Sequence, residues 1–233
     1  MAVADYHARR GEVQTYFDRT AAETWARLTS TAPVGRIRST VRAGRDEMRR
    51  TLLAFLPSDL SGRRLLDAGC GTGLLAVEAA RRGADVLAVD LSPTLIGIGR
   101  ERLPADLAGG RVDLRSGDML DAALGGFDHV VAMDSLIHYR STDAVRVIGE
   151  LSQRTRHSIV FTFAPRTAPL AAMHALGRLF PRSNRAPSIE PVAERRLRAA
   201  IRESVMLRGW RIGRTRRVVS GFYTSQALEL VRA

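Results

Sequence analysis

Apolar positions change their spacing along the chain. From residue 63 onward, short apolar runs with the length of buried strands alternate with segments in which apolar residues recur at helical spacing. Strands that alternate with helices in this way are typical of a parallel sheet with right-handed crossovers and helices on both faces. The predicted strands are residues 63–69, 84–90, 110–118, 127–135 and 157–165, and the predicted helices are residues 74–83, 93–103 and 141–153.

The two ends of the chain follow other patterns. Residues 1–57 place apolar side chains at helical spacing as far as a proline, which predicts a helical arm that covers the rest of the molecule. Residues 210–233 are read as two strands about a Ser-Gly turn, most simply an antiparallel hairpin at one end of the sheet. Residues 164–192 are too long for a tight connection, and we expect them to form a helical flap after the fifth strand.

These elements predict an α/β fold with a mostly parallel seven-stranded sheet. The arm, residues 1–57, precedes a main domain, residues 58–233, that contains the flap. Sheets of this kind bind ligands beyond the carboxyl ends of their strands. The segments that we expect to share this rim are residues 67–73, 90, 117–119, 134–139 and 163–166.

Composition narrows the functional classes. All 36 basic residues are arginine, the formal net charge is +12, and the arginines are dispersed along the chain. Without a clustered basic stripe, this charge favours an anionic small substrate or an acidic partner over nucleic acid. A single cysteine, Cys70, excludes an internal disulfide and a multi-cysteine zinc site, and we expect no resident metal ion. No apolar run has the ~20 residues that span a bilayer and no signal peptide is evident, so we expect a cytoplasmic enzyme.

The segment "DAGCGTG", residues 67–73, carries the candidate chemistry. Gly69, Gly71 and Gly73 stand between a predicted strand and a predicted helix, where glycine lets a ligand approach the backbone and the helix start favours an anion. A dinucleotide site has the pattern G-x-G-x-x-G or -A, but Leu74 occupies the sixth position here. This departure disfavours an NAD-linked oxidoreductase.

Asp67 indicates a different cofactor. A carboxylate is a poor neighbour for a pyrophosphate and a good one for an ammonium or sulfonium group, which points to S-adenosylmethionine. We expect Asp67 to face the positive end of this cofactor, directly or through water. Asp90 would accept hydrogen bonds from both ribose hydroxyls, and Asp134 on the same rim is a further expected cofactor contact. Asp118 with Met119 would frame the adenine, with an ordinary turn after the third strand as the alternative for Asp118. S-adenosylhomocysteine would be the product.

Several motifs resemble a known family. The segments "DAGCGTG", "VDLS", "GDML" and "FDHVVAMDSLIHY" are similar to class I S-adenosylmethionine-dependent methyltransferases across residues 60–163. More narrowly, "YFDRTAAETWARL", "FTFAPRT", "GRLFPRSNRAP" and "SGFYTSQALELVRA" resemble the magnesium-protoporphyrin O-methyltransferases of the bacterial photosynthetic pathway. The resemblance implies a Rossmann-like fold and methylation of one propionate of the magnesium porphyrin, an early step towards bacteriochlorophyll.

The resemblance also assigns substrate contacts. A propionate is ionised at neutral pH, since its unperturbed pKa is about 4.3, so no general base is needed. His138 is expected to donate a hydrogen bond to the propionate or to bind the porphyrin's magnesium, and these alternatives stay open. The expected apolar walls of the porphyrin site are Tyr16, Phe17, Trp25 and Tyr139, with plain helix or core packing as the alternative role. The expected partners of the propionates are Arg166 and either Arg182 or Arg185, with a solvated surface position as the alternative.

The porphyrin is poorly soluble, which raises the question of partners. The resemblance implies transfer from the magnesium chelatase, through its large subunit. The basic surface and the segment "LAAMHALGRLFPR" would dock onto that subunit or make peripheral contact with the anionic inner membrane. Rival functions are methylation of another small acid, phenol or quinone precursor, nucleic-acid modification or binding, and non-catalytic carriage of the porphyrin.

Overall fold

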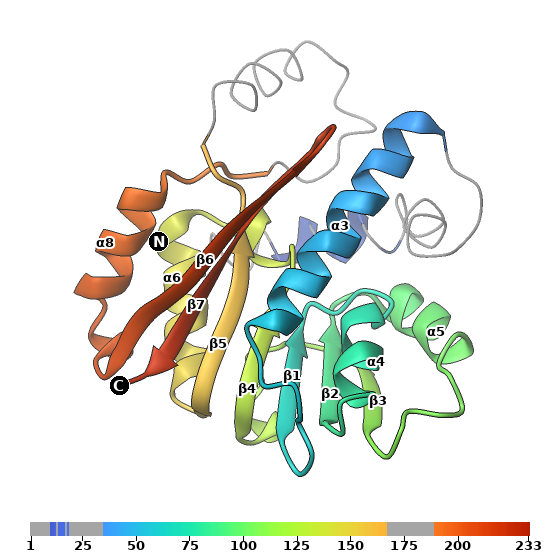
Figure 1. Cartoon of the computed structure of the whole chain (residues 1–233). Coiled ribbons are helices and arrows are strands. Elements are labelled where there is room, and N and C mark those ends of the chain that lie inside the picture. The colour runs from blue at the N-terminus through green and yellow to red at the C-terminus, as the bar shows by residue number, and fades with distance from the viewer. Residues whose placement is uncertain (1–9, 13, 17, 19–34, 167–188) are drawn as a thin grey trace.

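The computed structural model describes residues 10–12, 14–16, 18, 35–166 and 189–233. Its centre is a seven-stranded sheet in the order β3-β2-β1-β4-β5-β7-β6 (Figure 1). The first five strands are parallel, and β7 pairs antiparallel with both β5 and β6. The predicted mostly parallel sheet with an antiparallel C-terminal hairpin is therefore confirmed. The strands are β1 Arg64–Ala68, β2 Asp85–Asp90, β3 Arg111–Ser116, β4 Phe127–Ala132, β5 Thr155–Phe163, β6 Trp210–Ser220 and β7 Tyr223–Arg232.

Helices cover both faces of the sheet. One apolar core joins the sheet to α6 and α8, and a second core joins the opposite face to α3, α4 and α5. Neighbouring strand residues divide between the two cores, as Leu65 and Leu66 do, because successive side chains of a strand point to opposite faces. The helices are α3 Arg36–Ala54, α4 Leu74–Ala80, α5 Pro93–Glu101, α6 Ser141–Ser152 and α8 Glu194–Glu203, and the short 3₁₀ turns are η2 Ala122–Leu124, η3 Leu136–His138 and η5 Val205–Leu207.

The helix α3, which forms the C-terminal part of the arm, belongs to the same core as the sheet. Its residues Met48, Leu52 and Leu53 are almost completely buried against β1 and its neighbours. Figure 1 shows α3 lying beside the tip of the β6–β7 hairpin. A Cβ atom built on Gly44 would come within 2.5 Å of the Tyr223 ring, so glycine allows the helix to approach β7 closely.

Polar contacts from the hairpin fix α3 in place. The Arg214 guanidinium of β6 donates to the backbone oxygens of Ala54 and Phe55 at the end of α3, and pairs with the buried Glu229 of β7 at 2.5 Å. At the other end, the turn at Gly221 has a positive φ of 55°, and Ser220 donates to the backbone oxygen of Thr40 at 2.9 Å. The hairpin therefore holds α3 at both of its ends.

Most of the predicted flap, residues 167–188, lies outside the described residues. Residues 164–166 and 189–192 are described, and they run side by side through a bridge between Pro165 and Val192. Within the described residues, no helix has the length and apolar character needed to cross a membrane.

Candidate active site

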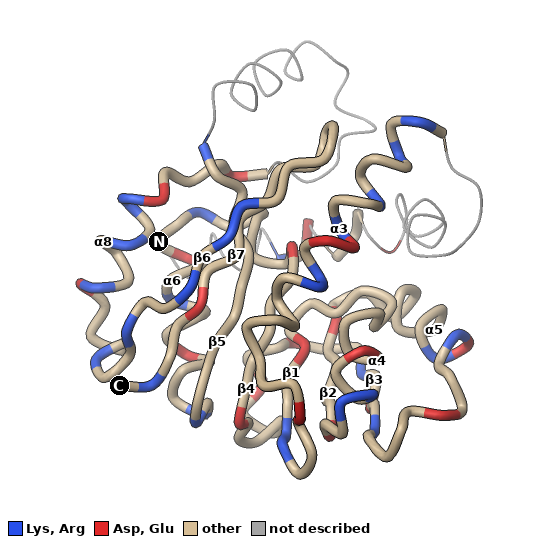
Figure 2. The backbone as a smooth tube through the Cα atoms, viewed as in Figure 1, with Lys and Arg blue, Asp and Glu red and all other residues tan. Residues whose placement is uncertain are grey.

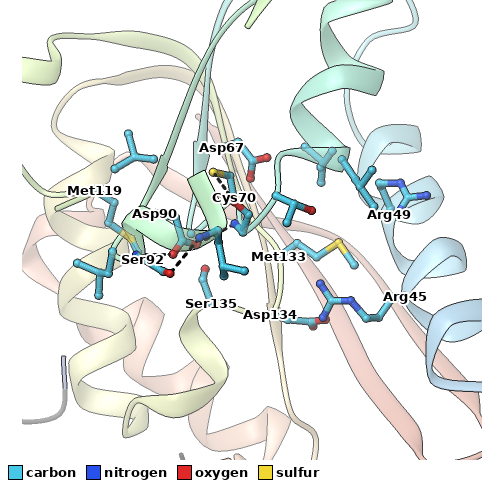
Figure 3. Close-up of a pocket in the computed structure, with 18 of the residues that line it drawn as sticks. Arg45, Arg49, Asp67, Cys70, Asp90, Ser92, Met119, Met133, Asp134 and Ser135 are labelled. Carbon is cyan, nitrogen blue, oxygen red and sulfur yellow. Dashed lines mark hydrogen bonds and ion pairs between the residues drawn. The ribbon is translucent and has the colours of Figure 1, made fainter. Parts of the chain in front are cut away.

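A pocket opens over the carboxyl ends of the parallel strands (Figure 3). Its lining comes from residues 69–72, 89–92 and 133–135, from η3 and from one face of α3. The empty volume, open solvent at the mouth included, is about 1060 Å³, enough for a cofactor and part of a second ligand. Arg45 and Arg49 reach in from α3 on one side, and Met119 and Ser92 stand on the opposite side (Figure 3).

The glycine loop needs its glycines for two reasons. Gly69, Gly71 and Gly73 all have a positive φ, of 80°, 57° and 78°, which side chains disfavour. A Cβ atom on Gly69 would also lie 2.3 Å from the Cβ atom of Ser135. Backbone bonds fasten the loop to the end of β2, because the Gly69 N–H donates to the Val89 oxygen at 2.8 Å. The result is a bare backbone facing the pocket.

Asp67, the next-to-last residue of β1, lies at the floor of this pocket. The side chain is 1% exposed, and burial, followed by the charge of Asp90, raises its pKa to about 7. One of its oxygens, Oδ2, is buried without a hydrogen-bond partner. A buried carboxylate of this kind is destabilised unless a positive group approaches it. The observation fits the ammonium or sulfonium of the expected cofactor.

Asp90 ends β2 and holds the loop. Its Oδ2 accepts from the Gly71 N–H at 2.8 Å and its Oδ1 from the Ser92 N–H at 2.9 Å. Burial raises the pKa of Asp90, although these hydrogen bonds oppose the shift. A carboxylate has about four acceptor positions. The predicted contact of Asp90 with the ribose hydroxyls stays a prediction, and the carboxylate has acceptor capacity beyond these two bonds.

Asp118 and Met119 follow β3 but point to different surroundings. Met119 is 7% exposed and lines the pocket. Asp118 is not among the lining residues; it accepts from the Leu120 N–H at 2.9 Å and forms an ion pair with Arg10. The predicted contact of Asp118 with an adenine stays a prediction, and the structure gives this carboxylate an intramolecular partner.

Asp134 follows β4 and joins three elements. Its carboxylate accepts from Arg45 of α3 at 2.7 Å, from Tyr223 and Ser225 of β7 at 3.1–3.2 Å and from Thr162 of β5 at 3.1 Å. Burial and the charge of Asp134 raise the pKa of Tyr223, so the phenol stays a donor. Asp134 lines the pocket, and its contact with a cofactor stays a prediction. In the structure, Asp134 links α3 to the sheet.

The chain after Asp134 carries the candidate catalytic residue. The predicted strand over residues 127–135 is wrong at its end: β4 stops at Ala132, and Asp134 has a left-handed φ of 53°. The Ser135 hydroxyl donates to the Ala68 oxygen at 2.7 Å, and η3 begins at the next residue. His138 and Tyr139, 7% and 4% exposed, thereby line the same pocket as Asp67.

Comparisons with known proteins decide the family. Residues 65–158 match a "Methyltransferase domain", and residues 132–232 match the family described as "Magnesium-protoporphyrin IX methyltransferase C-terminus". The "Magnesium-protoporphyrin O-methyltransferase" of Rhodobacter capsulatus is 53% identical to this chain over 97% of its length and 98% of the relative. The chain belongs to the magnesium-protoporphyrin O-methyltransferases. The Synechocystis relative of the same name is 32% identical, over 95% of each chain.

Solved structures place the fold in the same family. The magnesium protoporphyrin IX methyltransferase of Synechocystis PCC 6803 with bound SAH superposes with a TM-score of 0.80 at 28% identity, over 96% of this chain and 99% of that one. The form with bound SAM gives a TM-score of 0.77 at 26% identity, over 97% of each chain. The predicted class I methyltransferase fold is confirmed, and this chain is an S-adenosylmethionine-dependent O-methyltransferase by family.

The sequence likeness to a methyltransferase of another pathway is local. A "Ubiquinone biosynthesis O-methyltransferase" of Xanthomonas euvesicatoria is 41% identical over 90 residues, which is 37% of each chain. The match to the magnesium-protoporphyrin family model covers residues 132–232, which include η3 and the C-terminal hairpin.

The predicted substrate contacts are only partly described. Phe17, Trp25, Arg182 and Arg185 lie outside the described residues. Tyr16 is partly buried, which raises the pKa of its phenol, and it is not a lining residue, whereas the nearby Gln14 is. Arg166 is exposed and borders a separate cavity. The porphyrin contacts of these side chains stay predictions.

Sequence reasoning missed the basic wall of the pocket. Arg42, Arg45 and Arg49 of α3 all line it, together with Asp46. Arg49 pairs with Asp46 at 3.0 Å and with Glu78 of α4 at 2.5 Å. A signal was present, because positions 42, 45 and 49 share one helix face. Guanidinium groups at this wall suit the carboxylate of a methionine-derived cofactor.

Proposed function

We propose that the protein transfers the methyl group of S-adenosylmethionine to a propionate of magnesium-protoporphyrin IX. The products are the monomethyl ester, an early intermediate of bacteriochlorophyll synthesis, and S-adenosylhomocysteine. The observation that carries the proposal is the 53% identity to the Rhodobacter capsulatus enzyme over nearly the whole of both chains. This match extends beyond residues 65–158, which match the general methyltransferase domain.

The residues at the floor of the pocket would hold the cofactor. Bound there, S-adenosylmethionine supplies a methyl group on a positively charged sulfur. A cationic ligand loses its hydration when it leaves water. The buried Asp67 carboxylate, whose Oδ2 has no hydrogen-bond partner, offers a negative charge that compensates for this loss. The glycine loop lets the ligand lie against the backbone, Asp90 receives hydroxyl donors, and the arginines of α3 face its carboxylate.

The chemistry makes few demands on a proton acceptor. The propionate is already an anion at neutral pH, since its pKa resembles the value of about 4.3 for glutamic acid. An oxygen of this anion forms the new bond to the methyl carbon, while the carbon–sulfur bond breaks and its electron pair stays on sulfur. The protein must exclude water and align the two groups, which can lower a barrier by roughly 7–11 kcal/mol.

His138 is placed to align the acceptor. It lines the pocket on η3, which the Ser135–Ala68 hydrogen bond holds against the end of β1. Two roles fit this position: a hydrogen bond to the propionate, or a bond to the porphyrin's magnesium. Tyr139 beside it is an apolar wall in either case.

The same proposal includes a docking surface for delivery of the porphyrin. Val219 and Phe222 at the hairpin tip and Ile37 at the start of α3 are 65%, 59% and 60% exposed. Basic residues follow β6 and α3 on either side of them (Figure 2). Such a basic, partly apolar end suits the chelatase large subunit or an anionic membrane. A cytoplasmic location with peripheral contact on the inner membrane stays a prediction.

An assay with the purified protein tests the activity. Incubation with S-adenosylmethionine and magnesium-protoporphyrin should give a product that is heavier by one methyl group, measured by mass spectrometry. Metal-free protoporphyrin and a panel of small acids, phenols and quinone precursors serve as comparison substrates. Faster turnover of one of these acceptors, by a protein that binds S-adenosylmethionine normally, would contradict the proposal.

A further inference from the structure

A second cavity borders the active site. It is lined by Arg140, Ser141, Arg166 and Arg196, together with Glu190 and residues 191–193. Its empty volume, open solvent included, is about 470 Å³. Arg140 directly follows His138 and Tyr139, which line the first pocket. The two cavities are therefore neighbours along one short stretch of chain.

Backbone hydrogen bonds hold this cavity against the turn that carries His138. The Glu190 N–H donates to the Ile137 oxygen within η3 at 2.8 Å. The Val192 N–H donates to the Ala164 oxygen at 2.9 Å, and the Arg166 N–H donates to the Val192 oxygen at 3.0 Å. The wall of the second cavity is thus fixed relative to the candidate catalytic residue.

The lining is strongly basic. The lining includes three arginines, Arg140, Arg166 and Arg196, and one carboxylate, that of Glu190. Of the acidic residues in the first turns of the adjoining helices, Asp143 is buried in α6, and Glu194 pairs with Arg198 and accepts from Gln226, both at 2.8 Å. Among the residues that the structure describes, the side chains of Arg166 and Arg196 make no hydrogen bond or ion pair.

Two helices also begin at this cavity. Ser141, the first residue of α6, and Ala193, the residue before α8, both line it. Neither helix start has a side-chain cap. The helix dipoles therefore add to the positive potential of the arginines and favour an anion with acceptor oxygens.

We infer that this cavity binds the second carboxylate of the substrate, the propionate that is not methylated. The inference rests on the proposed function and deepens it. The two propionates of the porphyrin extend from neighbouring pyrrole rings on the same edge of the disc. One of them must reach the pocket beside His138, and the other then points along the wall that Arg140 continues. Arg166 and Arg196 hold it and thereby set which propionate is presented for methyl transfer.

The test compares porphyrins that carry two free carboxylates with those that carry one. The ligands are magnesium-protoporphyrin and its two half-esters, titrated by porphyrin fluorescence into the protein saturated with S-adenosylhomocysteine. The proteins are wild type, the double variant Arg166→Gln with Arg196→Gln, and the control Arg195→Gln. Arg195 is an exposed arginine of α8 beside Arg196 that does not line the cavity. Unchanged melting temperatures establish that the variants are folded.

We expect wild type and the control to bind the diacid roughly 10- to 100-fold more tightly than either half-ester, as charged hydrogen bonds imply. In the double variant, the diacid should lose this advantage over the half-ester that keeps the reacting carboxylate. An undiminished advantage in the double variant would overturn the inference, as would equal binding of all three ligands by wild type. The proposed function is judged separately, by whether wild type forms the methyl ester from the diacid.

Discussion

The affinity of the protein for S-adenosylmethionine should depend on pH through Asp67. Burial and the charge of Asp90 raise the pKa of this carboxyl to about 7 in the free protein. An acid with a raised pKa is neutral below that value and negatively charged above it. Only the charged form attracts a cationic ligand, so the affinity should increase as the pH rises towards 7.

The magnitude follows from the fraction of charged Asp67. With a pKa of about 7, that fraction is about 3% at pH 5.5 and about half at pH 7. The apparent affinity scales with the binding-competent fraction, so it should increase roughly 15-fold over this range. The ammonium group of the ligand stays protonated throughout, because its ordinary pKa is about 7.8.

Calorimetric titration of wild type and Asp67→Asn with S-adenosylmethionine, at several values of pH from 5.5 to 7, measures the effect. Asn keeps the shape of the side chain but cannot ionise, so the variant should bind weakly and with a flat pH profile. Asp85→Asn is the control, because this carboxylate at the start of β2 is about half exposed and pairs only at the surface. Parallel profiles for wild type and Asp67→Asn would refute the reasoning.

Three further changes probe the site and its support. Gly69→Val should abolish S-adenosylmethionine binding, because its Cβ would lie 2.3 Å from that of Ser135, whereas Gly97→Val has open space around it and should bind normally in the same calorimetric assay. His138→Ala should slow methyl transfer in a steady-state assay while leaving S-adenosylmethionine affinity unchanged; a collapse of that affinity would show that the residue is misplaced. Arg214→Ala should lower the free energy of unfolding in urea by about 1–3 kcal/mol, because the buried Glu229 loses its ion-pair partner and the end of α3 loses its hydrogen bonds. Arg216→Ala, which removes only a surface pair with Glu47, should change stability far less, and equal effects would argue against the special role of Arg214.

The sheet and the glycine loop could be predicted because their signals are local. Strands buried on both faces appear as continuous apolar runs, and the loop between β1 and α4 requires glycine at positions 69, 71 and 73 whatever surrounds it. The Ser220–Gly221 turn was likewise identified from its own two residues. These features do not depend on contacts between distant parts of the chain.

Other features depend on such contacts, and these the sequence could not supply. Arginines at helical spacing on α3 suit a solvated face as well as a pocket wall, and the outcome depends on how the hairpin orients the helix. Asp134 adopts a left-handed φ, and its carboxylate accepts from Arg45, Thr162 and Tyr223, all far from it in sequence. For Asp118 the sequence offered an adenine contact or an ordinary turn after the third strand, and it gave no sign of the partner Arg10, which lies 108 positions away.

The attachment of α3 to the hairpin has a consequence for synthesis on the ribosome. A chain leaves the ribosome with its N-terminus first, and its early segments begin to fold before the later ones have been synthesised. The helix that walls the pocket is held by Arg214, Tyr223 and Ser220, which are translated long after it. The nascent chain can therefore assemble β1 to β5 around the glycine loop, yet its cofactor site stays open on one side until the last two strands have left the exit tunnel.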